Sequence, residues 1–217
     1  MSLDRIMNAR SVAIIGASRN PTKRGYQTIR VLLEEQYEGE IYPVNPKEEK
    51  ILGLTCYPSL AGIEATVDLA LICTPAKTIP SILEACGEKG VAGAVLLAGG
   101  FGETGQDGRQ LEETIVAVAR ARNIRLVGPN TSGMFNLKSS MNLVGLRDAP
   151  KGNIALLTQS GNMALTLIME AKIKSHKGFS YYVGVGNEAD IKFHEYLEFF
   201  RNDPDTRAVL MYVEGMR

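Results

Sequence analysis

The segment from Gly16 to Gly25 carries residue types that bind phosphate. It joins an apolar run to a stretch with helical spacing, a position where free helix-terminal amides and the helix dipole attract anions. Gly16 permits a tight turn, while Ser18 and Thr22 supply hydroxyl groups. The GxGxxG fingerprint is absent, so the segment predicts a phosphate site without identifying the ligand. The candidate cofactor-binding residues in this segment are Gly16, Ala17, Ser18, Lys23 and Gly25.

The residues after the second and third apolar runs narrow the choice of nucleotide. An NAD site places Asp or Glu after the second strand, where it accepts hydrogen bonds from the ribose hydroxyls. This sequence has Asn45 and Lys47 instead, and a lysine attracts a phosphorylated ribose that a carboxylate would repel. CoA or NADP is therefore favoured over NAD, unless Asn45 only forms a turn and Lys47 is a surface charge. Thr74 and Pro75 follow the third run, where proline fixes a loop that can wall a ligand or begin a helix.

A second candidate anion site is Thr158–Asn162, which ends an apolar run and begins a helix. Gly161 lets the backbone approach a ligand closely, and the amides of Gly161, Asn162 and Met163 are expected to point toward one spot. Such a helix N-terminus can receive a phosphate or an acyl phosphate. The equally open alternative is that Ser160 is an ordinary N-cap.

Acidic residues and histidines add few further candidates. Glu214 follows the last apolar run, where it can orient a basic group or a histidine or be a solvated side chain. Glu188 and Asp190 have either a functional role or, more commonly, a role in capping the next helix. His176 and His194 are interpreted as structural or exposed residues. The sequence contains no HExxH motif, Ser-His-Asp order or metal cluster.

The chain repeats one unit, a short apolar run followed by a loop and an amphipathic segment. The apolar runs span 11–16, 40–45, 67–73, 92–98 and 124–127. Continuous β-branched runs are typical of strands buried on both faces, and their alternation with helical segments predicts an α/β fold with a parallel sheet. Ligands bind such sheets beyond the carboxyl ends of the strands, where the strand order reverses. The candidate segments therefore lie where a ligand is expected.

The pattern changes in the last third of the chain. Residues 134–152 have no clear period, and 148–152 predict a boundary between a domain at 1–150 and a second domain at 151–217. The second domain is expected to have strands at 153–158, 181–185 and 208–213, with helices at 163–171 and 191–201. The helix at 163–171 is apolar nearly all round and is expected to be buried. Because this is a small core with an exposed edge strand, we expect an incomplete domain that is covered by a partner or in an oligomer.

Charge and composition exclude several classes of protein. The 24 Lys and Arg residues balance 24 Asp and Glu, whereas nonspecific nucleic-acid binding needs an excess of cations. No run approaches the ~20 apolar residues of a membrane span, and the N-terminus lacks a secretory apolar region. The three cysteines have no CxxC spacing, so neither a disulfide framework nor a metal site is expected, and a cytoplasmic location fits.

Several segments, taken in order, resemble the NDP-forming acyl-CoA synthetases, the group that includes the succinyl-CoA synthetase α-subunit and ADP-forming acetyl-CoA synthetases. The segments are 11–25, 42–46 (YPVNP), 72–76 (ICTPA), 99–103 (GGFGE), 127–133 (VGPNTSG), 158–162 (TQSGN), 185–190 (VGNEAD) and 203–215. They span nearly the whole chain. The resemblance implies a Rossmann-like CoA-binding domain followed by a flavodoxin-like domain.

The resemblance also implies a reaction and roles for individual residues. An acid, CoA and an NTP would give acyl-CoA, an NDP and phosphate, through an acyl phosphate and a phosphohistidine. The positions that match the family's CoA site are Ser18, Lys23, Asn45, Lys47, Thr74 and Pro75. The positions that match its catalytic centre are Ser160, Gly161 and Asn162 at the phosphate-receiving helix terminus, Glu214, which would orient the histidine, and Asn130 near the acyl-transfer centre.

The chain departs from the family in ways that leave its exact activity open. The phosphorylated histidine lies in a Ser-His-Thr-Gly segment that has no counterpart here, since neither His176 nor His194 matches it. The ATP-grasp domain that would bind NDP or NTP with Mg²⁺ is also absent, so it is expected in cis or in trans. Thr131 stands where succinyl-specific relatives carry cysteine, and Asn162 replaces a small residue, so the small carboxylic acid is not identified. The alternatives are a non-enzymatic CoA- or nucleotide-binding sensor and an NADP oxidoreductase.

Overall fold

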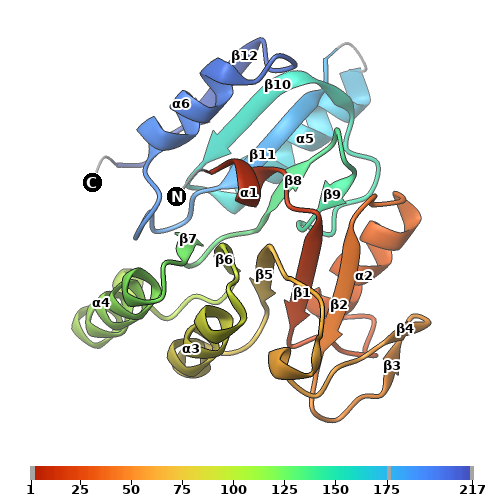
Figure 1. The fold of residues 1–217 in the computed structure, drawn as a ribbon. Helices are drawn as coiled ribbons and strands as arrows, with labels where there is room; N and C mark the ends of the chain where they lie inside the picture. Colours follow the sequence, from red (N-terminus) through yellow and green to blue (C-terminus); the bar gives the residue numbers. More distant parts are fainter. Residues whose placement is uncertain (1–2, 175–176, 216–217) are drawn as a thin grey trace.

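The computed structural model describes residues 3–174 and 177–215, which form two lobes, each built on one large sheet (Figure 1). The strands of the first sheet are β1 (Ser11–Ile15), β2 (Glu40–Val44), β5 (Leu69–Ile72), β6 (Gly93–Leu96) and β7 (Arg125–Val127). They are all parallel, in the order β2-β1-β5-β6-β7. The five apolar runs of this half of the chain are therefore strands, and the predicted α/β fold is confirmed.

Helices cover both faces of this sheet. They are α2 (Arg24–Glu34), α3 (Ile79–Lys89) and α4 (Gln106–Ala121). Successive side chains of a strand point to opposite faces. Accordingly, Ile14 of β1 packs in one cluster with Ile29 of α2, whereas its neighbour Ala13 packs in another with Leu83 of α3 and Ile115 of α4. Burial on both faces explains why these strands are continuous apolar runs rather than alternating ones.

The strand order reverses between β1 and β5. The chain passes from β1 to β2 in one direction across the sheet and then returns to β5 on the other side of β1. A crevice forms beyond the carboxyl ends of two such neighbouring strands, because the following loops diverge to opposite faces. The loops that begin at Gly16 and Cys73 occupy this position.

The second sheet contains β12 (Ala208–Tyr212), β10 (Lys151–Thr158), β11 (Phe179–Gly184), β8 (Met134–Asn136) and β9 (Met141–Asn142), in that order. The strands β10, β11 and β12 are parallel, whereas β8 is antiparallel to both β11 and β9. The two strands β8 and β9 come from the segment without periodicity. Of these two, β8 pairs with β11, which lies beyond residue 150, and β9 pairs with β8. The domain division at residue 150 stays a prediction.

The helix α5 (Gly161–Lys174) is not the buried helix that its composition predicts. Leu165, Met169 and Ile173 are 39%, 44% and 73% exposed, while Ala164 and Ile168 face the sheet and are buried. The expectation of burial was wrong because an apolar composition does not provide a second surface to cover the outer face. The other helix of this lobe, α6 (Phe193–Asn202), is amphipathic and buries Phe193, Tyr196 and Phe200.

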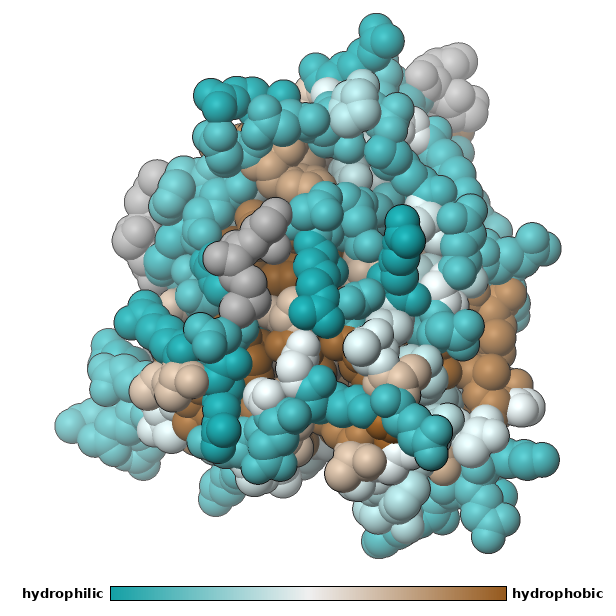
Figure 2. Space-filling model, in the orientation of Figure 1, coloured by the Kyte–Doolittle hydropathy of each residue, from teal (hydrophilic) through white to brown (hydrophobic). Residues whose placement is uncertain are grey.

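Smaller elements complete the described part of the chain. They are α1 (Asp4–Met7), the hairpin of β3 (Lys50–Ile51) and β4 (Leu54–Thr55), and the single turns η1 (Leu60–Gly62), η2 (Ala76–Thr78) and η3 (Gly102–Thr104). The face seen in Figure 2 is largely hydrophilic, and hydrophobic residues show mainly in its recesses. Among the described residues, no helix combines the length and apolar character needed to cross a bilayer.

Candidate functional site

The turn after β1 depends on two glycines. Gly16 has φ +83°, and a Cβ there would lie 2.8 Å from Cγ2 of Thr74. At Gly25, near the start of α2, a Cβ would lie 2.8 Å from the carbonyl oxygen of Gly16 and 3.0 Å from Cα of Ala17. These separations are shorter than side chains tolerate, so the helix can approach the strand only because both residues are glycine. The two glycines therefore allow the turn, the start of α2 and the loop that begins at Cys73 to pack closely against one another.

Asn45 ties the loop after β2 to this turn. Its Nδ2 donates to the carbonyl oxygen of Ala17 at 2.6 Å, and its Oδ1 accepts from the amide of Lys47 at 2.9 Å. An ion pair between Arg19 and Glu48 joins the same two loops. The Asn45 side chain thus has the turn-forming role that the sequence left open, and it also fixes the backbone that carries the exposed Lys47.

A cavity of about 460 Å³ lies at the point where the strand order reverses. Four of the candidate cofactor-binding residues line it, namely Gly16, Asn45, Thr74 and Pro75. The hydroxyl of Thr78 donates to the carbonyl oxygen of Pro75 at 2.7 Å and contacts Oγ1 of Thr74 at 2.9 Å, which fixes this wall.

The remaining candidates do not line the cavity. Ala17 is fully buried beneath the turn, and the side chain of Lys23 is exposed. The hydroxyl of Ser18 accepts a hydrogen bond from the amide of Asn20 at 3.1 Å, so it stabilises the loop. Most of the cavity wall is apolar and includes Leu60 and Ile82. An apolar wall with a few polar groups suits a ligand that has an apolar body and some polar groups.

The N-termini of α2 and α5 approach each other through Ser132. Nη2 of Arg24, the first residue of α2, donates to the carbonyl oxygen of Ser132 at 2.8 Å. At Gly161, the first residue of α5, a Cβ would lie 3.2 Å from Cβ of Ser132. The two predicted anion sites therefore belong to one region between the lobes. Arg24 supplies a positive charge at this junction, and its contact with Ser132 could not be predicted from the sequence.

Ser160 is an N-cap, and it leaves neighbouring amides available. Its Oγ accepts from the amide of Met163 at 3.4 Å, while Oγ1 of Thr158 accepts from the amide of Ser160 at 2.8 Å. Within the described residues, the amides of Gly161 and Asn162 have no hydrogen-bond partner. Two free N–H groups at the start of a helix of 14 residues provide donors for an anion.

Gln159 holds the segment after β12 against this helix terminus. Its Oε1 accepts from the amides of Glu214 and Gly215 at 2.7 and 3.1 Å, and its Nε2 donates to the carbonyl oxygen of Gly215 at 2.9 Å. Glu214 is thereby fixed at the carboxyl edge of the second sheet, beside Ser160, with its side chain exposed.

Asn187 joins the loops of the two lobes. Its Nδ2 donates to Oε2 of Glu103 at 2.5 Å and to Oε2 of Glu112 at 2.8 Å, and its Oδ1 accepts from Nδ2 of Asn130 at 3.4 Å. Oε1 of Glu103 accepts from the amide of Gly100 at 2.6 Å. We call these four side chains, Asn187, Glu103, Glu112 and Asn130, the interlobe clamp. It orients Asn130, the candidate for the acyl-transfer centre, and sequence reasoning missed it because the partners are far apart in the chain.

Two side chains near the junction at Ser132, those of Cys73 and Tyr182, are neutral at neutral pH. Burial raises the pKa of the Cys73 thiol to about 12, although the charge of Arg24 opposes the shift, so this residue is a thiol at neutral pH. Burial also raises the pKa of Tyr182 to about 12, against the effects of Arg24 and of the hydrogen bond with Ser132. Neither residue therefore supplies an anion that would repel a phosphate.

Glu188 caps the next helix, as the capping interpretation predicts, whereas for Asp190 that interpretation was wrong, because its carboxylate binds β7 instead. Oε1 of Glu188, which is 4% exposed, accepts from the amide of Phe193 at the start of α6 at 3.1 Å. Oδ2 of Asp190 accepts from the amide of Leu126 and from Nε of Arg125, both at 2.9 Å. His194 is exposed on α6, away from the junction, and His176 lies outside the described residues.

Replacing Asn187 with aspartate is expected to destabilise the fold by about 2 kcal/mol at neutral pH, because it places a third carboxylate against Glu103 and Glu112 and removes two donated hydrogen bonds. Urea unfolding measures this change. Asn153→Asp, which alters an exposed residue of β10, is the matched control and is expected to change the free energy of unfolding by less than about 0.5 kcal/mol.

The loss of stability in Asn187→Asp is expected to depend on pH. Burial alone would raise the pKa of Glu103, but hydrogen bonds from Asn187 and from the amides of Gly100 and Phe101 outweigh it and hold that pKa below its usual value. In the native protein this contribution is present at neutral pH and is lost as the pH falls through the lowered pKa. The Asn187→Asp penalty should therefore shrink between neutral pH and about pH 4, as carboxylates become protonated. A penalty that grows in acid would contradict the assignment.

Comparisons with known proteins give two domain matches. Residues 10–136 match the model of the CoA binding domain family, and residues 151–217 match that of the succinyl-CoA ligase like flavodoxin domain.

The chain is also similar to whole proteins. It is 39% identical to the alpha subunit of an ADP-forming acetate–CoA ligase II of Pyrococcus furiosus, over 99% of this chain and 47% of that protein. It is 40% identical to an ADP-forming acetate–CoA ligase of Methanocaldococcus jannaschii, over 99% of this chain and 30% of that one. A solved structure of the dinucleotide forming acetyl-coenzyme A synthetase 1 of Ca. Korarchaeum cryptofilum, in complex with phosphate and ADP, matches with a TM-score of 0.95 and 34% identity, over 100% of this chain and 46% of that one. The chain thus spans at most about half the length of these relatives.

Proposed function

Because this chain belongs to the NDP-forming acyl-CoA synthetases, we propose that it supplies the CoA site and the phosphate-receiving site of an acid–thiol ligase. In the proposed reaction, a small carboxylic acid, CoA and an NTP give acyl-CoA, an NDP and phosphate. The observation that carries the proposal is the junction at Ser132. There a helix that begins beside the cavity of the first lobe meets a helix of the second lobe that has two free N-terminal amides.

CoA would occupy the cavity at the reversal of strand order. The wall formed by Gly16, Thr74 and Pro75 would contact its body, and Lys47 would attract its 3′-phosphate. The thiol would then lie toward the junction between the lobes. The acyl group would be exchanged near Asn130, whose amide the interlobe clamp holds in place.

The amides of Gly161 and Asn162 would stabilise the phosphate as it leaves the acyl phosphate. Preorganised N–H donors act mainly on charge that develops in the transition state, and they cost no rearrangement when the reaction occurs. Glu214 would orient a histidine that carries the phosphate to and from this site. That histidine, and an ATP-grasp domain that binds the NTP with Mg²⁺, would lie in another part of the protein or in a partner subunit.

The relatives favour the ligase over the two alternative functions. Relatives that match nearly the whole chain are named as ADP-forming ligases, which gives no support to a non-enzymatic sensor. An NADP oxidoreductase is disfavoured because the family match is to CoA binding and the junction offers N–H donors rather than a proton donor of suitable pKa. Calorimetry with CoA, NADP and NAD tests the assignment, which fails if a nicotinamide nucleotide binds and CoA does not.

Replacing Lys47 with glutamate is expected to weaken binding of CoA about tenfold, while binding of dephospho-CoA changes less than about twofold. The difference arises because only CoA carries the 3′-phosphate. Isothermal titration of both ligands makes the measurement, and Lys177→Glu, the same charge reversal at an exposed position of the second lobe, is the control. Equal losses for the two ligands would show that Lys47 does not contact this phosphate.

A further inference from the structure

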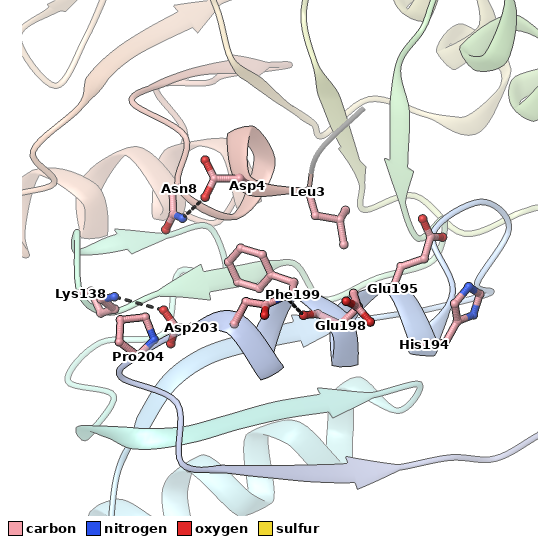
Figure 3. Close-up of a pocket in the computed structure, with 11 residues that line it drawn as sticks. Leu3, Asp4, Asn8, Lys138, His194, Glu195, Glu198, Phe199, Asp203 and Pro204 are labelled. Atoms are coloured by element: carbon pink, nitrogen blue, oxygen red, sulfur yellow. Dashed lines mark hydrogen bonds and ion pairs between the residues drawn. The ribbon is translucent and has the colours of Figure 1, made fainter.

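A cavity of about 760 Å³ between α1 and α6 has a wall whose charges are balanced within the protein (Figure 3). Each carboxylate that lines it has a hydrogen-bond or ion-pair partner, and the figure shows two of these contacts, Asn8 with Asp4 and Lys138 with Asp203. The interlobe clamp, by contrast, includes an acceptor without a hydrogen-bond partner among the described residues. It is Oδ1 of Asn130, whose side chain is exposed.

The carboxylate of Glu103 determines which way the side-chain amide of Asn187 points. Its Oε1 accepts from the amides of Gly100 and Phe101 at 2.6 and 3.2 Å, and its Oε2 accepts from Nδ2 of Asn187 at 2.5 Å. Burial opposes ionisation, but the hydrogen bonds outweigh it and hold the pKa of Glu103 below its usual value, so at neutral pH both oxygens can only accept. Nδ2 of Asn187 must therefore face Glu103, and Oδ1 must face away from it.

Asn187 in turn determines the orientation of the Asn130 side chain. Oδ1 of Asn187 lies 3.4 Å from Nδ2 of Asn130, which donates to it. If either amide were reversed, two oxygens or two nitrogens would face each other at this distance. The backbone of Asn130 is also fixed, since its N–H donates to the carbonyl oxygen of Ala98 at 2.9 Å. Oδ1 of Asn130 is therefore the atom of this side chain that is left to accept from a ligand.

This oxygen lies on the same sheet edge as the proposed CoA cavity, and adjoining loops connect the two. A Cβ built at Gly99 would lie 3.2 Å from Oδ1 of Asn130, and one at Gly100 would lie 3.6 Å from Cβ of Ala76. Ala76 follows Pro75, which lines the cavity. From β1 to β7 there are three strand spacings, or about 14 Å. A long ligand such as CoA can therefore extend along this edge from the cavity to Asn130.

An acceptor at this position suits one reactant and not the other. The pantetheine arm of CoA ends in an amide N–H and a thiol, which are both donors, whereas an ionised acyl phosphate carries only acceptors. We propose that Oδ1 of Asn130 accepts a hydrogen bond from the terminal amide or thiol of this arm, and that Glu103 is a positioning residue that sets this polarity through Asn187. The inference rests on the proposed CoA site and adds the group that holds the reactive end of the ligand.

Replacing Glu103 with glutamine should reverse this polarity and weaken binding of CoA at least about fivefold. The new side-chain oxygen must accept from the amides of Gly100 and Phe101, so the new NH₂ group faces Nδ2 of Asn187. Two donors in contact favour rotation of the Asn187 amide and then of the Asn130 amide. Asn130 would then present a donor to the donors of the arm.

Two further variants separate this effect from the loss of a charge. One oxygen of Glu112, Oε2, accepts both from the amide of Gly102 at 3.1 Å and from Nδ2 of Asn187 at 2.8 Å. Glutamine can keep both bonds, so Glu112→Gln should weaken CoA binding at least about threefold less than Glu103→Gln does. Glu113→Gln, at an exposed position of α4, is the matched control and should change the affinity less than about twofold.

Isothermal titration of the full chain with three ligands makes the test. Adenosine 3′,5′-bisphosphate lacks the arm, so its affinity should change less than about twofold in Glu103→Gln, whereas general damage to the fold would weaken both this ligand and CoA. Desulfo-CoA lacks only the thiol. A loss that persists with desulfo-CoA identifies the amide as the donor, and a loss confined to CoA identifies the thiol. The inference is overturned if CoA and the bisphosphate lose affinity equally, or if Glu103→Gln binds CoA as well as Glu112→Gln does.

Failure of the proposed function would give a different result, because the native chain itself would then not bind CoA. Should Glu103→Gln fail to fold, two substitutions of Asn130 decide the polarity. Asn130→Ala removes the acceptor and should weaken CoA binding at least about fivefold, whereas Asn130→Asp keeps an acceptor and should retain at least about twice the affinity of the alanine variant. A loss in Asn130→Asp as large as that in Asn130→Ala would show that this side chain does not accept from the arm.

Discussion

Replacing Gly16 with valine is expected to reduce the affinity of the chain for CoA at least about 100-fold, the largest loss we expect from a single change in the first lobe. The reason is geometric. A Cβ at this position would lie 2.8 Å from Cγ2 of Thr74 and 3.3 Å from the carbonyl carbon of Cys73, and φ of +83° is unfavourable for a β-branched residue. The turn after β1 must move away from the loop after β5, which begins at Cys73. The cavity wall that these two loops form moves with it. Calorimetry with CoA measures the loss.

The control for Gly16→Val separates backbone strain from damage to the site. Gly53 has nearly the same φ, +86°, but no atom lies within 4 Å of a Cβ built there. Gly53→Val therefore introduces the same backbone strain in the β3–β4 turn without a steric clash, and its affinity for CoA is expected to stay within about threefold of the native value. If both variants lose CoA binding equally, general destabilisation explains the result and the cavity is not the CoA site.

The strands of the first sheet could be predicted because each of them is a continuous apolar run in the sequence. A run such as Val12 to Ile15 is apolar at every position only if helices cover both faces, and the structure has α2 on one face and α3 with α4 on the other. The strands β8 and β9 could not be predicted. They are only three and two residues long, too short to show a period, and β8 is held by pairing with β11, which follows more than forty residues later.

The site was predictable in its position but not in its connections. Gly16, Asn45, Thr74 and Pro75 could be placed at one cavity because the carboxyl ends of parallel strands share an edge. The contact of Arg24 with Ser132 and the interlobe clamp around Asn187 could not, because each joins residues more than fifty positions apart through side chains of ordinary type. Asn45 shows the same limit. In the sequence it stands where an NAD site would have an acidic residue, whereas in the structure its side-chain amide also donates to the carbonyl oxygen of Ala17 in the turn after β1.

Replacing Gly161 with valine is expected to reduce turnover of the complete ligase at least about 100-fold while CoA binding stays within about threefold, because the variant alters the phosphate site alone. A Cβ at Gly161 would lie 3.2 Å from Cβ and 3.3 Å from Oγ of Ser132, and the two additional methyl groups of valine must then occupy space beside the free amides of Gly161 and Asn162. A phosphate could no longer approach those amides. Rates of acyl-CoA formation and calorimetry with CoA, measured on the same preparation, give the two numbers.

Two further substitutions show whether the backbone amides are responsible. Asn162→Ala retains both N–H donors and removes only an exposed side chain, so its turnover should stay within about fivefold of the native value. Ser160→Ala removes the acceptor for the Met163 amide and should cost about 1 kcal/mol of stability, with a smaller loss of turnover than Gly161→Val. The order of turnover losses is the decisive result, because an anion held by backbone amides requires Gly161→Val to be the most damaging of the three. If Asn162→Ala were the worst, the phosphate would be held by a side chain, and the convergence of two helix N-termini at Ser132 would have another purpose.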